Sequence, residues 1–219
     1  MRRMATTLLT LTLLTAFAGV PAASGATPNH IAVIGDSYTT GSDQGGRGPN
    51  GWAPQVWQML ARQGWSIAPD VAAEGGAGYG VRGNRGSVFG DLTARAVQPD
   101  DALVVFFGSR NDQRIDPQAL ATAAHDAFAL ARRTAPNARL LVIGPPWPTA
   151  DVPGVVLQIR DVLYTQARLA GAAFMDPLTA RWFFDTPNLI GTDGVHPTDA
   201  GHAYLAQLIA PLIAAQLRR

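Results

Sequence analysis

One short stretch near the amino end, residues 31–37, most constrains how this chain can fold. It reads Ile-Ala-Val-Ile-Gly-Asp-Ser, four apolar residues that run straight into a turn sequence. The run is too short for a helix and rich in β-branched residues, which predicts a buried strand. In a parallel sheet covered by helices, ligands bind at the carboxyl ends of the strands. Ser37 is therefore expected at the rim of a binding site.

Strand-like and helix-like segments alternate along the rest of the chain. Strands are expected at 31–34, 65–72, 102–107, 139–143 and 172–175, and helices at 51–63, 91–97, 117–134, 154–170 and 198–217. Glycine and proline concentrate in the loops after strands, where binding loops are expected. The alternation predicts one α/β domain over residues 27–219, with a parallel sheet, right-handed crossovers and helices on both faces.

The composition excludes several kinds of site. All 17 basic residues are arginine, so a Schiff-base lysine and a Walker-type phosphate loop are absent. There is no cysteine, which removes thiol nucleophiles, thiolate metal sites and disulfides. Glu74 is the only glutamate, which disfavours a paired-Glu glycosidase, although aspartate could take the place of glutamate. The net charge of +1 gives no reason to expect nucleic acid as a partner.

The first 26 residues have the layout of a secretory signal peptide. The first four include two arginines, the next sixteen are apolar apart from threonines, and residues 21–26 are small or turn-forming. Cleavage is expected after Ala26, with Ala22 or Ala23 as alternatives. A membrane anchor is the other interpretation, but the apolar run is shorter than the usual spanning length. We therefore expect a secreted or cell-envelope protein with no stable membrane anchor after cleavage.

A serine at a strand end becomes a nucleophile when a histidine and an orienting group converge on it. The best candidates lie near the other end of the chain, in the Asp-Gly-Val-His-Pro segment 193–197. Of the four histidines, only His196 has a carboxylate, Asp193, three residues before it in a loop. Asp193 could then hold the imidazole in the tautomer that accepts the serine proton. Ser109 also follows a strand and is the internal competitor of Ser37 as nucleophile.

These residues resemble the motifs of the GDSL/SGNH hydrolase family. The Gly-Asp-Ser-Tyr segment 35–38 and the segment 193–197 match its first and last blocks, and the resemblance covers nearly the whole mature chain. The second block is similar to residues 73–77 and the third to residues 108–112. In the third block, either there is one residue more between Gly108 and Asn111 than in the usual pattern, or Ser109 replaces the glycine.

The resemblance implies a flavodoxin-like three-layer α/β/α sandwich with five parallel strands in the order 2-1-3-4-5. It also implies roles for five residues. Ser37 would attack an acyl carbonyl, His196 would be the general base and then the acid, and Asp193 would orient it. The oxyanion hole would consist of the backbone N–H groups of Ser37 and Gly76 and the side-chain amide of Asn111. Neither a metal nor another cofactor is expected.

The expected activity is hydrolysis of a small-molecule acyl ester through an acyl-enzyme. Short acyl or acetyl groups on carbohydrate or lipid are the favoured substrates. An acyltransferase with the same triad and a catalytically silent binding module remain alternatives. The sequence leaves the acyl length, the alcohol portion and the oligomeric state open. It also leaves open whether the aromatic residues Trp147, Trp182, Phe183 and Phe184 belong to the core or to a pocket.

Residues 78–83 formally fit a glycine-rich dinucleotide pattern, Gly-Tyr-Gly-Val-Arg-Gly. The pattern follows the second expected strand rather than the first, and no clean helix comes directly after it. Nucleotide binding is therefore disfavoured. His202 is expected to pack against the start of the last helix rather than to act in catalysis.

Overall fold

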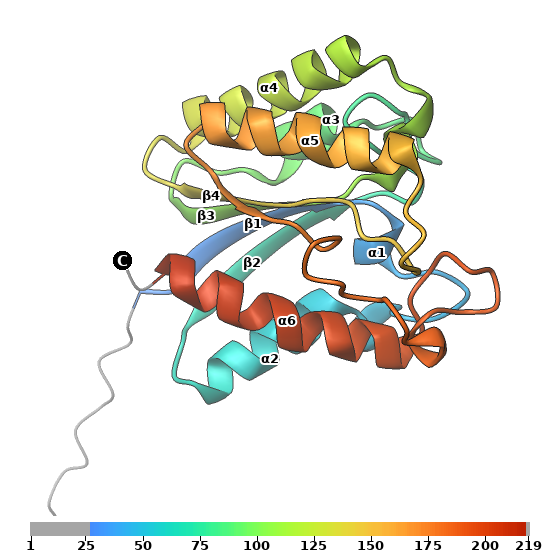
Figure 1. Cartoon of the computed structure of the whole chain (residues 1–219). Helices are drawn as coiled ribbons and strands as arrows, with labels where there is room; N and C mark the ends of the chain where they lie inside the picture. Colours follow the sequence, from blue (N-terminus) through green and yellow to red (C-terminus); the bar gives the residue numbers. More distant parts are fainter. Residues whose placement is uncertain (1–26, 218–219) are drawn as a thin grey trace, which may run out of the picture.

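A computed structural model describes residues 27–217 and is built around one parallel sheet (Figure 1). The strands are β1 (Asn29–Gly35), β2 (Ile67–Ala73), β3 (Asp101–Phe107), β4 (Arg139–Ile143) and β5 (Ala173–Met175). They lie in the order β2-β1-β3-β4-β5 and every neighbouring pair is parallel. The predicted strand order 2-1-3-4-5 is confirmed.

Helices cover both faces of the sheet and make three layers (Figure 1). One face carries α3 (Phe89–Ala96), α4 (Pro117–Thr134) and α5 (Gly154–Leu169). The other carries α2 (Trp52–Arg62) and α6 (Asp199–Leu217). The flavodoxin-like α/β/α architecture is therefore confirmed. No helix among residues 27–217 is long and apolar enough to cross a bilayer.

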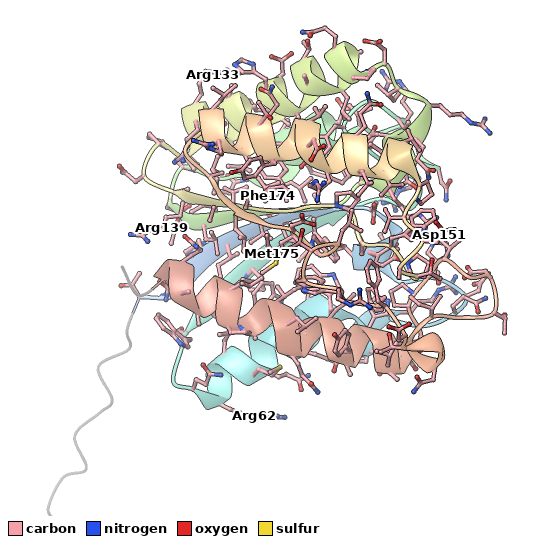
Figure 2. All side chains as sticks on the ribbon, viewed as in Figure 1. Arg62, Arg133, Arg139, Asp151, Phe174 and Met175 are labelled. Atoms are coloured by element: carbon pink, nitrogen blue, oxygen red, sulfur yellow. The ribbon has the colours of Figure 1, made fainter. Side chains whose placement is uncertain are left out.

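Two hydrophobic cores lie on the two sides of the sheet because alternate residues of a strand point to opposite faces. Ala32 and Ile34 of β1 join the core under α3, α4 and α5, whereas Ile31 and Val33 join the core under α2 and α6. The same alternation appears in β5, where Phe174 and Met175 point to opposite sides (Figure 2). Burial on both faces explains why the strands read as continuous apolar runs.

The differences from the sequence-based elements are small and local. A one-turn helix, α1 (Ser37–Thr40), begins where only a loop was expected. The helix α3 begins at Phe89 rather than at residue 91, and α6 begins at Asp199 because the hydroxyl of Thr198 accepts a hydrogen bond from the backbone N–H of Gly201. Gly-rich sequence follows α1 and precedes α3, and periodicity is a weak signal in such stretches.

Candidate active site

The nucleophile candidate Ser37 stands at the carboxyl end of β1, as the first residue of α1. Gly35 is required just before it, because a Cβ atom there would collide with the side chain of Thr39. The carboxyl group of Asp36 accepts a hydrogen bond from the backbone N–H of Tyr38 at 2.9 Å and caps α1. This tight strand-to-helix turn presents the Ser37 side chain at the edge of the sheet.

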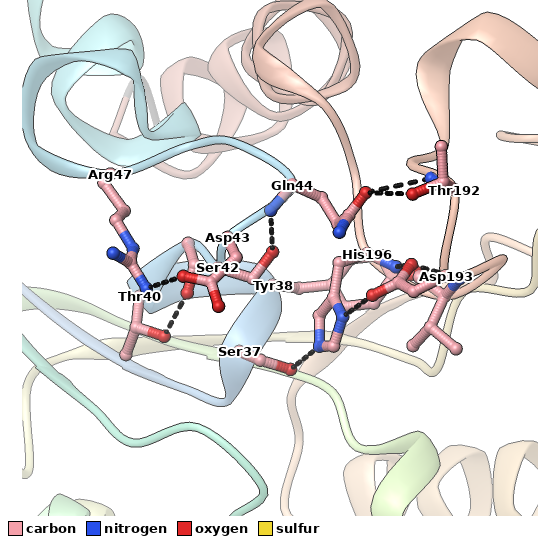
Figure 3. Close-up of polar contacts among 12 residues, drawn as sticks. Ser37, Tyr38, Thr40, Ser42, Asp43, Gln44, Arg47, Thr192, Asp193 and His196 are labelled. Atoms are coloured by element: carbon pink, nitrogen blue, oxygen red, sulfur yellow. Dashed lines mark hydrogen bonds and ion pairs between the residues drawn. The ribbon is translucent and has the colours of Figure 1, made fainter.

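Ser37, His196 and Asp193 form one chain of hydrogen bonds across the site (Figure 3). Asp193 Oδ2 lies 2.6 Å from His196 Nδ1, and His196 Nε2 lies 3.0 Å from Ser37 Oγ. Because a carboxylate can only accept, Nδ1–H donates to Asp193, and the free lone pair of Nε2 faces the Ser37 hydroxyl. The structure thus brings together three residues that are 156 and 3 positions apart.

The Asp193 carboxylate also shapes the turn that carries His196. Its Oδ1 atom accepts hydrogen bonds from the backbone N–H groups of Val195 at 2.9 Å and His196 at 3.0 Å. Gly194, between Asp193 and Val195, has φ +67°, which favours glycine. Burial alone would raise the pKa of Asp193, but the hydrogen bonds from His196 and Val195 outweigh it and lower the pKa to about 2. The carboxylate is therefore ionised at neutral pH and fixes the imidazole tautomer.

Two contacts join the nucleophile side of the site to the histidine loop. The hydroxyl group of Tyr38 donates to the backbone carbonyl of Val195 at 2.5 Å. The Gln44 side-chain oxygen accepts hydrogen bonds from the backbone N–H of Thr192 at 2.9 Å and from its hydroxyl at 3.2 Å (Figure 3). These contacts hold the imidazole in register with the serine although the two loops come from opposite ends of the chain.

Three hydrogen-bond donors border the same pocket as the serine. The side-chain amide of Asn111 and the residues Ser37 and Gly76 all line it. Gly76 has φ +79°, a left-handed conformation that favours glycine. Within the described part of the chain, neither the backbone N–H of Ser37 nor that of Gly76 donates to a protein acceptor. Such free donors can receive a negatively charged oxygen.

Ser109, the competing serine, supports Asn111 instead of facing the pocket. It is fully buried, and its hydroxyl donates to the carbonyl of Ala77 at 3.1 Å. The same oxygen accepts the backbone N–H of Asn111 at 3.0 Å. The amide group of Asn111 also donates to Ala77 at 2.8 Å. Ser109 therefore fixes the loop that leads from β3 to Asn111. Because it is buried, a substrate cannot reach its hydroxyl group.

The glycine-rich stretch 78–83 is occupied by a side chain of the protein itself. The buried carboxyl group of Asp112 accepts the backbone N–H groups of Tyr79, Gly80 and Val81 at 2.8 to 3.1 Å. A phosphate would need these same donors. The nucleotide-binding interpretation is thus excluded, and Asp112 braces this loop against the segment that carries Asn111.

The remaining sequence candidates are structural. His202 is fully buried, and its Nδ1 atom accepts the backbone N–H of Trp52 at 3.3 Å. Burial lowers the pKa of His202 to about 4, so the ring is neutral near pH 7. Trp182 and Phe183 belong to the core beneath α6. No group of three metal-ligating side chains occurs among the described residues.

The pocket in front of Ser37 is open and has a volume of about 570 Å³. Its wall consists of Ser37, Arg47, Asn111 and the segments 40–43, 74–76, 84–85 and 195–196. Most of these residues are polar or glycine. The site therefore combines a serine–histidine–aspartate chain, free N–H donors and a solvent-accessible pocket lined mainly by polar residues and glycine, which together suit acyl transfer.

The model of the GDSL-like lipase/acylhydrolase family matches residues 33–204, which is most of the chain. The chain belongs to this family. A curated relative, GDSL lipase Rv0518 of Mycobacterium tuberculosis, is 67% identical over 192 residues, covering 86% of this chain and 83% of the relative. As a GDSL-family protein, the chain is an ester hydrolase of the esterase/lipase type.

Solved structures of esterases share the fold of this GDSL hydrolase. The psychrotrophic esterase EstA from Pseudoalteromonas sp. superposes with a TM-score of 0.67 at 16% identity, covering 87% of this chain and 100% of that one. A family two carbohydrate esterase from Clostridium thermocellum gives 0.68 at 18% identity, covering 88% and 66%. At these identities the likeness concerns the fold.

Sequence reasoning missed the residues that hold the GDSL hydrolase site together. Tyr38 and Gln44 carry no catalytic signature, and their partners lie about 150 positions away. No sequence signal pointed to Asp36 either, yet its Oδ2 atom accepts a hydrogen bond from Nδ2 of Asn111 at 3.4 Å. The sequence offered one signal for Tyr38, namely its position directly after the nucleophile. A residue at that position lies close to the loops that surround the nucleophile.

Proposed function

We propose that this GDSL hydrolase is a serine esterase that works through a covalent acyl-enzyme. The observation that carries the proposal is the hydrogen-bonded chain from Asp193 through His196 to Ser37, with distances of 2.6 and 3.0 Å. In this arrangement His196 accepts the proton of the Ser37 hydroxyl as its oxygen attacks the ester carbonyl. Asp193 stabilises the imidazolium that results.

The tetrahedral intermediate places a negative charge on the former carbonyl oxygen. The backbone N–H groups of Ser37 and Gly76 and the amide of Asn111 are the donors that stabilise it. His196 then gives its proton to the departing alcohol, which leaves the acyl group on Ser37. A water molecule, activated by the same imidazole, releases the acid and restores the serine. The cycle uses no cofactor.

The lining of the pocket favours a short acyl group on a hydroxyl-rich alcohol. Val195 is the one aliphatic residue among the described residues that line it, and the rest offer hydroxyl, amide, carboxylate, guanidinium, imidazole or backbone groups. A fatty chain gains roughly 0.8 kcal/mol per methylene only where apolar surface covers it. A sugar, by contrast, needs polar partners. Acetyl-sized esters of a carbohydrate are therefore our proposed substrates.

A series of 4-nitrophenyl esters from acetate to palmitate tests the proposed function. We expect the highest kcat/KM with the acetyl and butyryl esters and no gain with longer chains. An apolar channel would instead raise kcat/KM about fourfold per added methylene. A maximum at palmitate would contradict the short-acyl proposal. Absence of turnover with every ester would contradict hydrolysis of simple esters and favour transfer to an acceptor sugar.

Residues 1–26 lie outside the described residues, and their role rests on the sequence. We propose that they form an export signal, removed to give a mature enzyme that acts in the cell envelope or outside the cell. The basic start, apolar run and small residues support this proposal. An exported enzyme of this type would meet polysaccharide and glycolipid esters directly.

A further inference from the structure

A buried carboxyl group lies directly behind the proposed oxyanion hole. Asp36 precedes the nucleophile in sequence, and only 2% of it is exposed. Its Oδ1 atom accepts the backbone N–H of Tyr38, and its Oδ2 atom lies 3.4 Å from Nδ2 of Asn111. The backbone of Gly108 closes the other side, where a Cβ atom would be 2.8 Å from Oδ2. The proposed mechanism gives this carboxyl group no part.

The amide nitrogen of Asn111 has two hydrogens, and they face different partners. One is held by the carbonyl of Ala77 at 2.8 Å. The other donates to Oδ2 of Asp36 at 3.4 Å, a long and therefore weak hydrogen bond that a stronger acceptor could replace. An ionised carboxylate would attract this hydrogen and would repel an oxyanion forming beside it. A protonated carboxyl group carries no charge, so it attracts this hydrogen much more weakly and does not repel the oxyanion.

The charged and titratable groups that face Asp36 come from three segments of the chain. Arg110 and Asp112 lie on the short 3₁₀ helix Arg110–Arg114, Tyr38 on α1, and Tyr79 on the loop after β2. No cation forms an ion pair with Asp36 in the part of the chain that the structure describes, and Arg110 packs its guanidinium over Trp147 at 4.0 Å instead. Burial is the largest influence and raises the pKa of Asp36 to about 7.

We propose that Asp36 is a positioning residue for the oxyanion hole. With its proton, Asp36 leaves the second amide hydrogen of Asn111 free for the substrate oxygen. Once the proton is lost, the carboxylate holds that hydrogen and opposes the oxyanion. This inference rests on the proposed serine mechanism. It predicts that kcat/KM also changes with pH through the ionisation of Asp36, a group outside the triad.

Measuring kcat/KM as a function of pH tests the effect of Asp36 ionisation directly. His196 acts as the general base only in its neutral form. We expect Asp36 to make the rate fall above about pH 7, because burial raises the pKa of its carboxyl group to about 7. The falling side approaches about tenfold per pH unit if the ionised form is inactive. A serine esterase without this group would instead reach a plateau.

Asp36→Asn tests the proposal because the amide keeps the shape of the carboxyl group but cannot ionise. We expect a lower rate overall, since a donor now faces Asn111, and we expect the falling side of the profile to disappear. Asp101→Asn is the matched control, because Asp101 is a buried carboxyl group, 4% exposed, at the far end of the sheet. It should lower stability without changing the profile. A profile for Asp36→Asn that is wild type in shape and merely scaled would overturn the proposal.

A second variant leaves Asp36 in place and guards against misfolding of Asp36→Asn. The positive charge of Arg110 lowers the pKa of Asp36, so Arg110→Gln should move the falling side of the profile to higher pH. An unmoved falling side, or none in the wild type, would contradict the proposal. Covalent labelling of Ser37 by an organophosphate distinguishes the two failures, because it reports the serine mechanism whatever the role of Asp36.

Discussion

Replacing Ser37 by alanine should abolish ester hydrolysis while the fold stays intact. The hydroxyl oxygen 3.0 Å from the His196 imidazole is the only atom in the hydrogen-bonded chain that can form the acyl-enzyme. Loss of a serine nucleophile lowers kcat by about 10⁴-fold or more, because the remaining groups cannot supply a substitute. We expect this loss with 4-nitrophenyl acetate, measured beside the wild-type enzyme.

Ser42→Ala is the matched control for this experiment. Ser42 lines the same pocket and is also a surface serine near the amino end, but it makes no contact with His196. Its activity should stay within about tenfold of wild type, the size of one lost uncharged contact. Thermal unfolding should show both variants folded. Full activity of a folded Ser37→Ala variant would exclude Ser37 as the nucleophile.

Replacing Asn111 by alanine should have the second-largest effect. The Asn111 amide borders the pocket with the free N–H groups of Ser37 and Gly76, and the proposed mechanism uses it as the third oxyanion donor. Loss of one such donor costs about 10²–10³ in kcat, or about 2.7–4 kcal/mol of barrier. KM should change little, because the contact strengthens only in the transition state.

Asn84→Ala provides the comparison for Asn111→Ala. Asn84 presents an amide on the same pocket wall, close to Gly76, but on the loop after β2. Its loss should change KM more than kcat if it contacts only the bound alcohol portion. Equal kcat losses for the two variants would contradict a specific oxyanion role for Asn111.

The fold was accessible from sequence because its signals are strong and local. The strands β1, β3 and β4 are buried on both faces and read as uninterrupted apolar runs. The helix α4 has proline at its start, Asp116 as its cap and two arginines in its last turn. Alternation of these elements leaves few topologies that obey right-handed crossovers. The one-turn helix α1, by contrast, depends on a single capping carboxylate.

The sequence predicted the site residues only where a recognisable motif carries residues of known chemistry. Ser37, Asp193 and His196 could be named because a serine at a strand end and an Asp-x-x-His turn carry chemical meaning by themselves. The contacts of Tyr38 with Val195 and of Gln44 with Thr192 could not be named, because they join residues about 150 positions apart. Periodicity and propensity describe neighbours along the chain, not pairs of that kind.

Covalent trapping of the nucleophile tests the central claim most directly. Diethyl 4-nitrophenyl phosphate phosphorylates activated serines, and intact-mass measurement followed by peptide mapping locates the label. We predict the addition of one diethylphosphoryl group, on Ser37 alone, with loss of esterase activity in proportion to labelling. A label on Ser109 or another residue, or ester hydrolysis that persists in fully labelled enzyme, would contradict the account.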